Sequence, residues 1–479
     1  MAGDAVPANR GGDVPALSGY DPESPLPRAG LGRFAFGSFG MGIYVTVPGL
    51  LLLYYLTNVL DVDAWLAGLV LLLPKFVDVV VHPFIGSLSD VGRARHGDRV
   101  RMLLIGTATL PFAFILLFAA PKGLLGGSAA LFVAVLFTLA NTMFAAYQVP
   151  YLSLPSDLAT GYNQRTRLMS WRMVVLTFGI LIGGALAPLL APQETAGRGQ
   201  YLSMAVVLGV IMLVTMLVGV SGVRLLLRTV PQSPSGGTHT SGGVIGRFKV
   251  AWSNKPFFWL MCSYLFMSTT THLLLAGTPF YTEYVMDNPK LTTVLFAAFV
   301  APAIVATPIW AKISRSRGKQ PCLLVAQSFC VIGSLLLLLG RPGGLVLVLP
   351  SMLLLGVAFA GMQLFPFSML PDTVKAGGED AQRNAGAFTG LWTATEATGA
   401  ALGPYLYAAT LAIGGFVSSQ ADETVTQSST AITAVRLGFG LVPALVMIVA
   451  IFLQTRYRLD DAARHAVDSP VDDSRVATS

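Results

Sequence analysis

The stretch PQSPSGGTHTSGG, residues 231–243, lies near the middle of the 479-residue chain and is rich in Pro, Gly, Ser and Thr. Such a composition is typical of a flexible loop and not of a packed helix. It belongs to a linker, residues 226–253, that divides two long apolar segments, residues 33–225 and 254–456. We therefore expect two bundles joined by this linker.

The composition of the chain points to a membrane protein. Hydrophobic residues make up 54% of the chain, charged residues only 11%, and the mean hydropathy is +0.66. Soluble domains carry about 25% charged residues. These values exclude a soluble enzyme, a disordered scaffold and a nucleic-acid binder, and they predict a partner in the lipid bilayer. The three cysteines are scattered, which predicts neither a disulfide framework nor a metal site.

Twelve membrane-spanning helices are predicted. A membrane helix needs about 20 residues with few charges, and no run shows the alternation of a barrel strand. A span at roughly 64–89 is apolar but contains Lys75, Asp78 and His82. The other eleven are uncharged runs at 34–60, 102–121, 123–156, 173–193, 199–223, 256–282, 291–311, 320–340, 342–371, 397–421 and 437–455.

The basic residues predict the orientation. With both termini in the cytoplasm, 24 of the 31 Lys and Arg residues lie in inner segments and 4 in outer loops. This bias follows the positive-inside rule and predicts a multi-pass protein of the cell membrane. Residues 1–32 and 457–479 are polar and are expected to be cytosolic tails, the first of them disordered. The first tail has no apolar run typical of a signal peptide.

The two apolar segments resemble each other. Residues 54–61, YYLTNVLD, match residues 280–287, FYTEYVMD, and residues 150–157, PYLSLPSD, match residues 366–372, PFSMLPD. Pro83 and Pro308 match at nearly the same offset. Two related six-helix bundles that rock about a central site are the layout of the major facilitator fold. Glycines spaced four apart predict close helix contacts at 179 and 183, 386 and 390, and 399 and 403.

The second span carries three ionisable side chains, Lys75, Asp78 and His82. A charge at bilayer depth is costly and is by default a candidate for function. The three positions fall within a sector of about 60° on a helix, so they can face a central cavity, and Asp78 can pair with both neighbours. A neutralised pair that only tolerates burial is the structural alternative. The functional interpretation is cation coupling, in which Asp78 changes its proton affinity with its partners and His82 accepts the proton.

Other ionisable residues in or near the spans leave alternatives open. Arg172 either extends to the membrane interface or points inward to bind substrate. Glu396 either faces the cavity or forms a structural salt bridge, and His272 either contacts a ligand or makes an ordinary interhelical hydrogen bond. Arg436 is interpreted as an interface anchor. Uncharged candidates for substrate binding, several of which packing alone would explain, are Tyr54, Tyr55, Gln148, Gln363 and Trp392.

The motif GSLSDVGRARHGDRVR, residues 86–101, resembles the loop after the second helix in glycoside–pentoside–hexuronide:cation symporters, the melibiose-permease-like branch of the major facilitator superfamily. FGSFG at 36–40, MLPD at 369–372, GLWT at 390–393, GAALGP at 399–404 and YRLD at 457–460 are also similar to this family. The resemblance extends from about residue 33 to 465. It implies a conformational role for the loop residues Asp90, Arg93, Arg95, Arg99, Asp157, Arg165, Asp372 and Arg383.

The resemblance also implies a monomer that takes up sugars or glycosides with a cation. Asp78 falls on the family's coupling aspartate, and Arg172 on an arginine that contacts sugar. Several positions depart from the family. His82 and Gln148 stand where the family has acidic residues, and Gly42 stands in place of an acidic sugar contact. Leu152 and Gln363 replace tryptophans, and Ala397 replaces a lysine. Sodium requires several oxygen ligands, so these losses favour a proton over Na⁺ as the coupling ion.

The leading hypothesis is a proton-coupled secondary transporter for a sugar, glycoside or related small organic solute, with no cofactor. Asp78 and His82 would carry the proton, Lys75 would modulate Asp78, and the substrate would contact Arg172 and other cavity residues. The alternatives are the same fold moving a lysolipid or amphipathic compound, and uncoupled or efflux transport. A membrane enzyme is disfavoured because the sequence has no Ser-His-Asp arrangement, clustered metal ligands or Gly-rich phosphate loop.

Overall fold

The computed structural model describes residues 24–96, 98–158, 162–193, 197–232, 252–378, 381, 385–420 and 425–458, and its regular elements are helices. The first half contains α1 (Arg28–Asn58), α2 (Ala64–His96), α3 (Val100–Leu117), α4 (Gly126–Asp157), α5 (Tyr162–Leu190) and α6 (Arg198–Thr229). The second contains α8 (Lys255–Phe280), the π-helix η1 (Tyr281–Val285), α9 (Leu291–Val300), α10 (Pro302–Arg317), α11 (Lys319–Leu337), α12 (Leu345–Ala376), α14 (Ala385–Ile413) and α15 (Ser429–Thr455).

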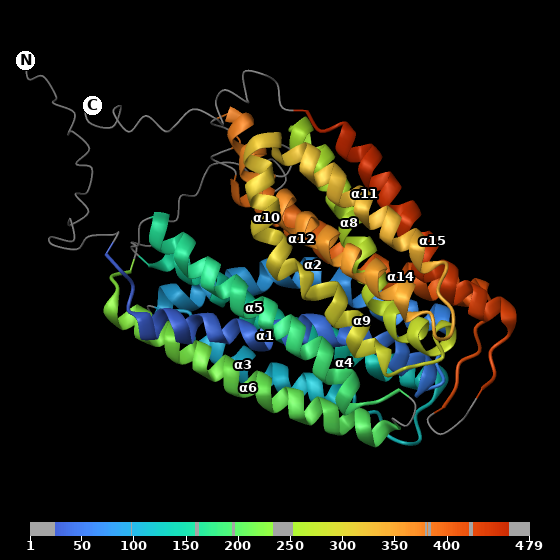
Figure 1. The fold of residues 1–479 in the computed structure, drawn as a ribbon. Coiled ribbons are helices and arrows are strands. Elements are labelled where there is room, and N and C mark those ends of the chain that lie inside the picture. The colour runs from blue at the N-terminus through green and yellow to red at the C-terminus, as the bar shows by residue number, and fades with distance from the viewer. Residues whose placement is uncertain are drawn as a thin grey trace, which may run out of the picture.

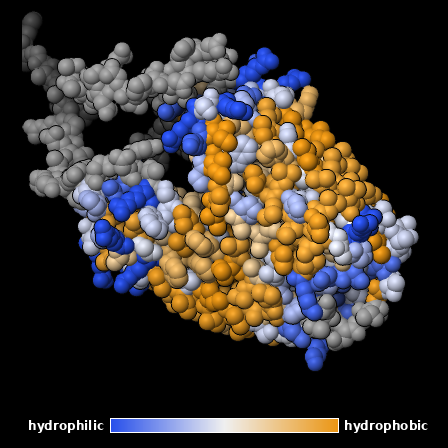
Figure 2. Space-filling model, in the orientation of Figure 1, coloured by the Kyte–Doolittle hydropathy of each residue, from blue (hydrophilic) through white to orange (hydrophobic). Residues whose placement is uncertain are grey.

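The helices have the length and composition of membrane spans. Within the described residues, ten helical segments are long and apolar enough to cross a bilayer. The two further predicted spans correspond to α2 and α14, which are 33 and 29 residues long and carry Asp78 and Glu396. A broad apolar band covers the molecule between two polar ends (Figure 2). The all-helical membrane fold is thus confirmed, and the count of twelve spans stays a prediction.

Several helix ends differ from the predicted limits. The predicted disordered tail, residues 1–32, is wrong over its last residues, because α1 begins at Arg28. Leu26 and Leu31 are only 3% and 5% exposed, so this segment packs against the bundle. The rest of that tail, residues 1–23, lies outside the described residues, as do 233–251 of the linker and 459–479 of the second tail.

Helices also continue through charged residues at which the uncharged runs stop. α2 extends to His96 instead of residue 89, and α14 begins at Ala385 instead of residue 397. Arg436 lies inside α15 and not at its edge. Charged side chains are tolerated within a membrane helix where they face the interior of the bundle and pair with other groups, because their exposure to lipid is costly.

Glycines bring equivalent helices of the two halves together in the same way. Gly183 on α5 faces α1, where an added Cβ would lie 3.0 Å from the Cα of Ile43. Gly403 on α14 faces α8, where a Cβ would lie 2.6 Å from the backbone oxygen of Thr269. The predicted close packing is confirmed for these two pairs of helices. It is wrong at Gly390, where a Cβ would meet open space.

The two bundles meet mainly at one end of the molecule. The Asn58 amide donates to the Tyr284 hydroxyl at 2.5 Å, and Asp61 N donates to Ser419 O at 3.0 Å. Between described residues, the hydrogen bonds that cross the halves all lie toward this end, where the loops predicted to face outside are found. The ribbons of the two halves separate toward the opposite end (Figure 1).

Candidate functional site

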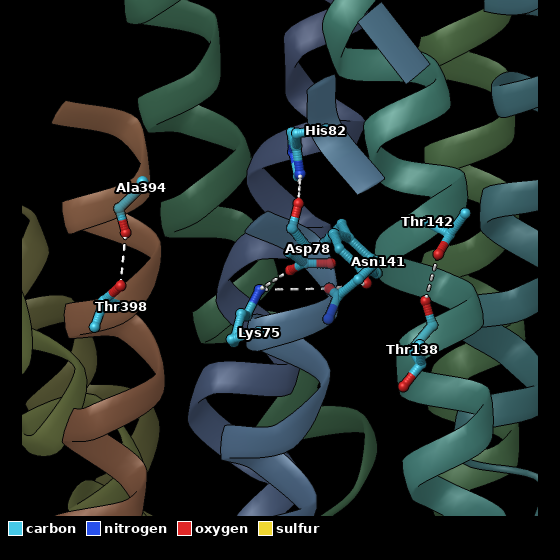
Figure 3. A network of polar contacts seen from close by, with 9 residues as sticks. Lys75, Asp78, His82, Thr138, Asn141, Thr142, Ala394 and Thr398 are labelled. Carbon is cyan, nitrogen blue, oxygen red and sulfur yellow. Dashed lines mark hydrogen bonds and ion pairs between the residues drawn. The ribbon is translucent and has the colours of Figure 1, made fainter. Parts of the chain in front are cut away.

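The first half places the predicted ionisable stripe of α2 next to α4. The Lys75 ammonium lies 3.1 Å from Asp78 Oδ2, so the predicted pair forms (Figure 3). Asp78 is 4% exposed, whereas the side chain of Lys75 is 24% exposed. A carboxylate buried to this degree needs a nearby positive charge or proton to be stable.

His82 belongs to the same stripe but does not contact the Asp78 carboxylate. Its ring Nδ1 donates to the backbone oxygen of Asp78 at 2.9 Å. The expected side-chain pairing of Asp78 with His82 is therefore wrong in this structure. The short imidazole side chain stays close to its own helix, where the carbonyl four residues earlier is within reach, while the carboxylate turns toward Lys75 (Figure 3).

Two residues that sequence reasoning missed complete this cluster. Asn141 on α4 accepts from Tyr44 Oη on α1 at 2.7 Å and from Lys75 Nζ at 3.5 Å. Asn141 is 2% exposed. The signal available in the sequence was a single Asn within the apolar run 123–156. The family resemblance had instead directed attention to Gln148, which lies seven residues later on α4 and is half-buried.

The second half contains a small polar cavity between α8, α12 and α14. About 270 Å³ of space free of protein atoms lies in and around it, open solvent included, and the part that water can enter has room for about one molecule. Three residues predicted to bind substrate, His272, Gln363 and Glu396, are brought together in its wall. The full lining is Tyr264, Met267, Ser268, Thr271, His272, Met362, Gln363 and Glu396.

An aromatic pair supports the carboxylate of this cavity. The Tyr264 hydroxyl lies close to the Glu396 carboxylate. The Tyr264 ring stacks on Trp392 with ring centroids 4.2 Å apart and an interplanar angle of 15°. Ser268 Oγ donates to the backbone oxygen of Glu396 at 3.0 Å. The last two contacts pack α8 against α14 next to Glu396. Tyr264 was not predicted.

Two basic residues of the first half lie within electrostatic range of residues in the cavity wall. Arg172 on α5 is 6% exposed and lies within electrostatic range of Glu396 and of Tyr151. Its burial favours the inward orientation over extension to the membrane interface. Lys75 lies within electrostatic range of His272 in the same way. The ionisable groups of the two halves therefore act on one another across the interface between the bundles.

Tyr54 and Tyr55 lie away from the cavity, at the end where the halves meet. Tyr54 Oη donates to the Glu283 carboxylate across the halves. Tyr55 is fully buried, donates to the backbone oxygen of Phe118 at 3.2 Å and packs against Tyr201. Tyr54 thus helps to close the interface, and Tyr55 packs within the first half.

Among the described residues, charged side chains beyond the spans form ion pairs in both halves. Asp157, at the end of α4, pairs with Arg93 at 2.6 Å and with Arg99 at 2.9 Å. Asp372, near the end of α12, pairs with Lys319 at 2.6 Å. Lys319 was not predicted, although the internal repeat places it at the start of the helix that corresponds to α3. Arg165 is exposed, and the side chains of Asp90, Arg95 and Arg383 lie outside the described residues.

Sequence comparisons identify relatives over nearly the whole chain. Residues 33–461 match the family described as MFS/sugar transport protein. An uncharacterised symporter of Synechocystis is 24% identical over 90% of this chain and 94% of its own. The glucuronide carrier protein homolog of Escherichia coli is 24% identical over 89% and 92%. The mouse sodium-dependent lysophosphatidylcholine symporter 1 is 23% identical over 68% and 66%.

Solved structures share the fold at low sequence identity. A bacterial homologue of the human lysosomal transporter Spinster, in an inward-facing and unoccupied conformation, superposes with a TM-score of 0.64 at 13% identity, over 92% of this chain and 97% of that one. The nucleoside transporter NupG superposes with a TM-score of 0.60 at 14% identity, over 93% and 100%. These neighbours support the two-bundle transporter fold.

Proposed function

Because the chain belongs to the MFS/sugar transport family, and within it to the glycoside–pentoside–hexuronide:cation symporters, we propose that it is a proton-coupled symporter of a sugar, glycoside or related small organic solute. Secondary transport follows from the family and the fold. The observation that carries the finer proposal is the pairing of buried Asp78 with Lys75, across the halves from the polar cavity that contains Glu396.

Asp78 is proposed as the coupling group. It is the buried carboxylate of the first half's cluster, and its partner Lys75 sits on the more exposed side. Movement of the ammonium toward or away from Asp78 changes the proton affinity of the carboxylate. A proton needs only one acceptor, whereas hard metal cations prefer several oxygen ligands. The cluster therefore favours H⁺ over Na⁺, with His82 as a neighbouring proton acceptor.

The cavity of the second half is proposed to bind the solute. Glu396, Gln363 and His272 offer hydrogen-bonding groups for hydroxyls, and the stacked Tyr264–Trp392 pair adds an aromatic wall. Small-molecule sites commonly combine an apolar wall with a few fixed polar groups. Arg172 would complete the site from the first half.

Transport is proposed to proceed by alternating access. The contacts between halves cluster at the end predicted to face outside, as expected for a carrier that faces the cytoplasm. The ion pairs of Asp157 and Asp372 lie at the other end, where the loops would tighten or loosen during the cycle. We further propose a monomer in the cell membrane with both termini in the cytoplasm.

The test is uptake into proteoliposomes with an imposed proton gradient, using sugars, glycosides and uronates as candidate solutes. The wild type should accumulate at least one of them uphill and take up protons with it. Asp78→Asn should abolish uphill accumulation while leaving downhill exchange. Asp63→Asn, which changes an exposed carboxyl at the start of α2, is the matched control and should behave as the wild type. Unchanged uphill accumulation by Asp78→Asn would reject the coupling assignment.

An amphipathic compound is the second candidate solute, because the relatives include a lysophosphatidylcholine symporter. Thermal unfolding of the purified protein in the presence of sugars, uronates and lysolipids separates the two. Stabilisation by sugars or uronates supports the leading proposal. Stabilisation by lysolipids alone would reject the sugar or glycoside as the solute and favour an amphipathic compound.

A further inference from the structure

The ammonium of Lys75 lies among three groups that are typical ligands for a cation. Its Nζ is 3.1 Å from Asp78 Oδ2, 3.5 Å from Asn141 Oδ1 and 5.7 Å from the centre of the Phe137 ring. Carboxylate and amide oxygens bind hard cations, and an aromatic face attracts positive charge. We refer to Asp78, Asn141, Phe137 and Tyr44 as the cation cage.

Tyr44 sets the orientation of the cage amide. Its hydroxyl donates to Asn141 Oδ1 at 2.7 Å, which directs the amide oxygen toward the ammonium. Tyr44 and Asn141 are 4% and 2% exposed, so neither side chain can turn to bulk water. The cage is thus built from α1, α2 and α4 and is held in place by packing.

The oxygens of the cage are largely occupied. Asn141 Oδ1 already accepts two donors, Tyr44 and Lys75, which uses both of its lone pairs. Asp78 Oδ2 accepts from Lys75. Among the described residues, Asp78 Oδ1 has no hydrogen-bond partner and is the one cage oxygen left over. A metal cation would find too few ligands here, and it would be repelled by the ammonium a few ångströms away.

We propose that Lys75 is a tethered cation that fills, from within the chain, a site that Na⁺ would otherwise occupy, so that the first half does not respond to sodium. The inference rests on the proposed function only in treating Asp78 as the coupling carboxylate. Without the ammonium, Asp78 Oδ2 and Asn141 Oδ1 would face one empty position, and Asp78 Oδ1, which has no partner, would be free on the same carboxylate. Lys75 is not one of the cage residues and 24% of its side chain is exposed, so replacing it removes the ammonium but no cage ligand.

The experiment measures sodium binding and not transport. The purified full-length protein is melted in NaCl and in choline chloride at equal ionic strength. The wild type should have the same unfolding temperature in both salts. Lys75→Ala, and as a second variant Lys75→Ser, should be stabilised by Na⁺ by several degrees in a saturable manner, because a ligand that binds only the folded state raises its stability.

Two controls separate the cage from a general salt effect. Lys75→Arg keeps a positive charge and should remain insensitive to Na⁺. Lys75→Ala/Asp78→Asn removes the carboxylate and should lose the sodium response. Gel filtration and a cooperative melting curve establish that each variant is folded. Sodium stabilisation of the wild type equal to that of Lys75→Ala would overturn the inference, and so would the absence of any response in both folded variants.

This outcome is independent of the uptake assay. A failure to accumulate solute with protons would reject the proposed function and leave the sodium response of Lys75→Ala as it is. An insensitive Lys75→Ala would reject the tethered cation and leave proton coupling through Asp78 intact.

Discussion

The two halves of the molecule share their framework and differ in their chemistry. In each, a glycine-bearing helix packs closely on the first helix of the bundle, as α5 does on α1 and α14 on α8. In each, an aspartate near the end of the fourth span pairs with a basic residue at the start of the third, Asp157 with Arg99 and Asp372 with Lys319. Each of these contacts joins helices within one bundle.

The middles of the halves have diverged. The first half holds the closed cation cage around Lys75, whereas the second holds a small cavity with Glu396 in its wall. The two copies of the repeat therefore keep equivalent packing contacts, while the polar residues between their helices differ. We interpret the first half as the ion-binding half and the second as the solute-binding half.

The largest expected effect comes from separating these tasks. Glu396→Gln should weaken binding of the solute that stabilises the wild type most by roughly tenfold or more, because a hydrogen bond to a charged group contributes about 1.5–3 kcal/mol. Proton uptake per solute should persist. Asp78→Asn should keep the affinity for the solute and lose the proton uptake that accompanies it. Titration calorimetry measures binding, and a pH dye inside the vesicles measures coupling.

A loss of coupling in Glu396→Gln with unchanged affinity would break the division of labour between the halves. Gln363→Glu is a useful companion variant, because it adds a second carboxylate to the same cavity. On its own it should change the affinity for the solute. Combined with Asp78→Asn, it should not restore proton coupling.

The ion pairs at the predicted inner end should contribute unequally to stability. Asp157 bridges two arginines whose side chains are 16% and 14% exposed, whereas Lys319 is 40% exposed. Removing one partner of a buried pair costs about 3–5 kcal/mol, and an exposed pair contributes about 1 kcal/mol or less. Asp157→Asn should therefore lower the unfolding temperature more than Asp372→Asn. Equal shifts would show that the two halves carry equivalent pairs.

The smallest effect is expected at the contact between the halves. Tyr284→Phe removes the acceptor of the Asn58 amide and should cost about 1 kcal/mol, which corresponds to roughly a fivefold shift toward the state open at that end. The shift is measured with His272→Cys in a chain whose native cysteines have been replaced. When the outer end opens more often, an impermeant thiol reagent added from outside labels this cysteine faster. Thr433→Ala, which removes an exposed hydroxyl on α15, should leave the rate unchanged.

Some parts of the site follow from spacing along one helix. The pair of Lys75 with Asp78 is local, three residues apart, and forms as predicted. The partners that come from other helices do not follow in this way. Asn141 and Tyr44 are isolated polar residues in apolar runs, and only the packing of α4 and α1 against α2 brings them to Lys75. His82 lies on the predicted stripe, yet its ring bonds its own backbone.

The amino-acid sequence alone determined the membrane-embedded helical class, the internal repeat and the predicted orientation, because these follow from hydropathy, spacing and the distribution of charge along the chain. Only the tertiary structure decided which side chains meet across helices: the cage around Lys75, the cavity that joins His272, Gln363 and Glu396, and the end at which the bundles touch. The physical reason is that these contacts join residues far apart in the chain, and helix packing angles and side-chain rotamers place them within a few ångströms of one another.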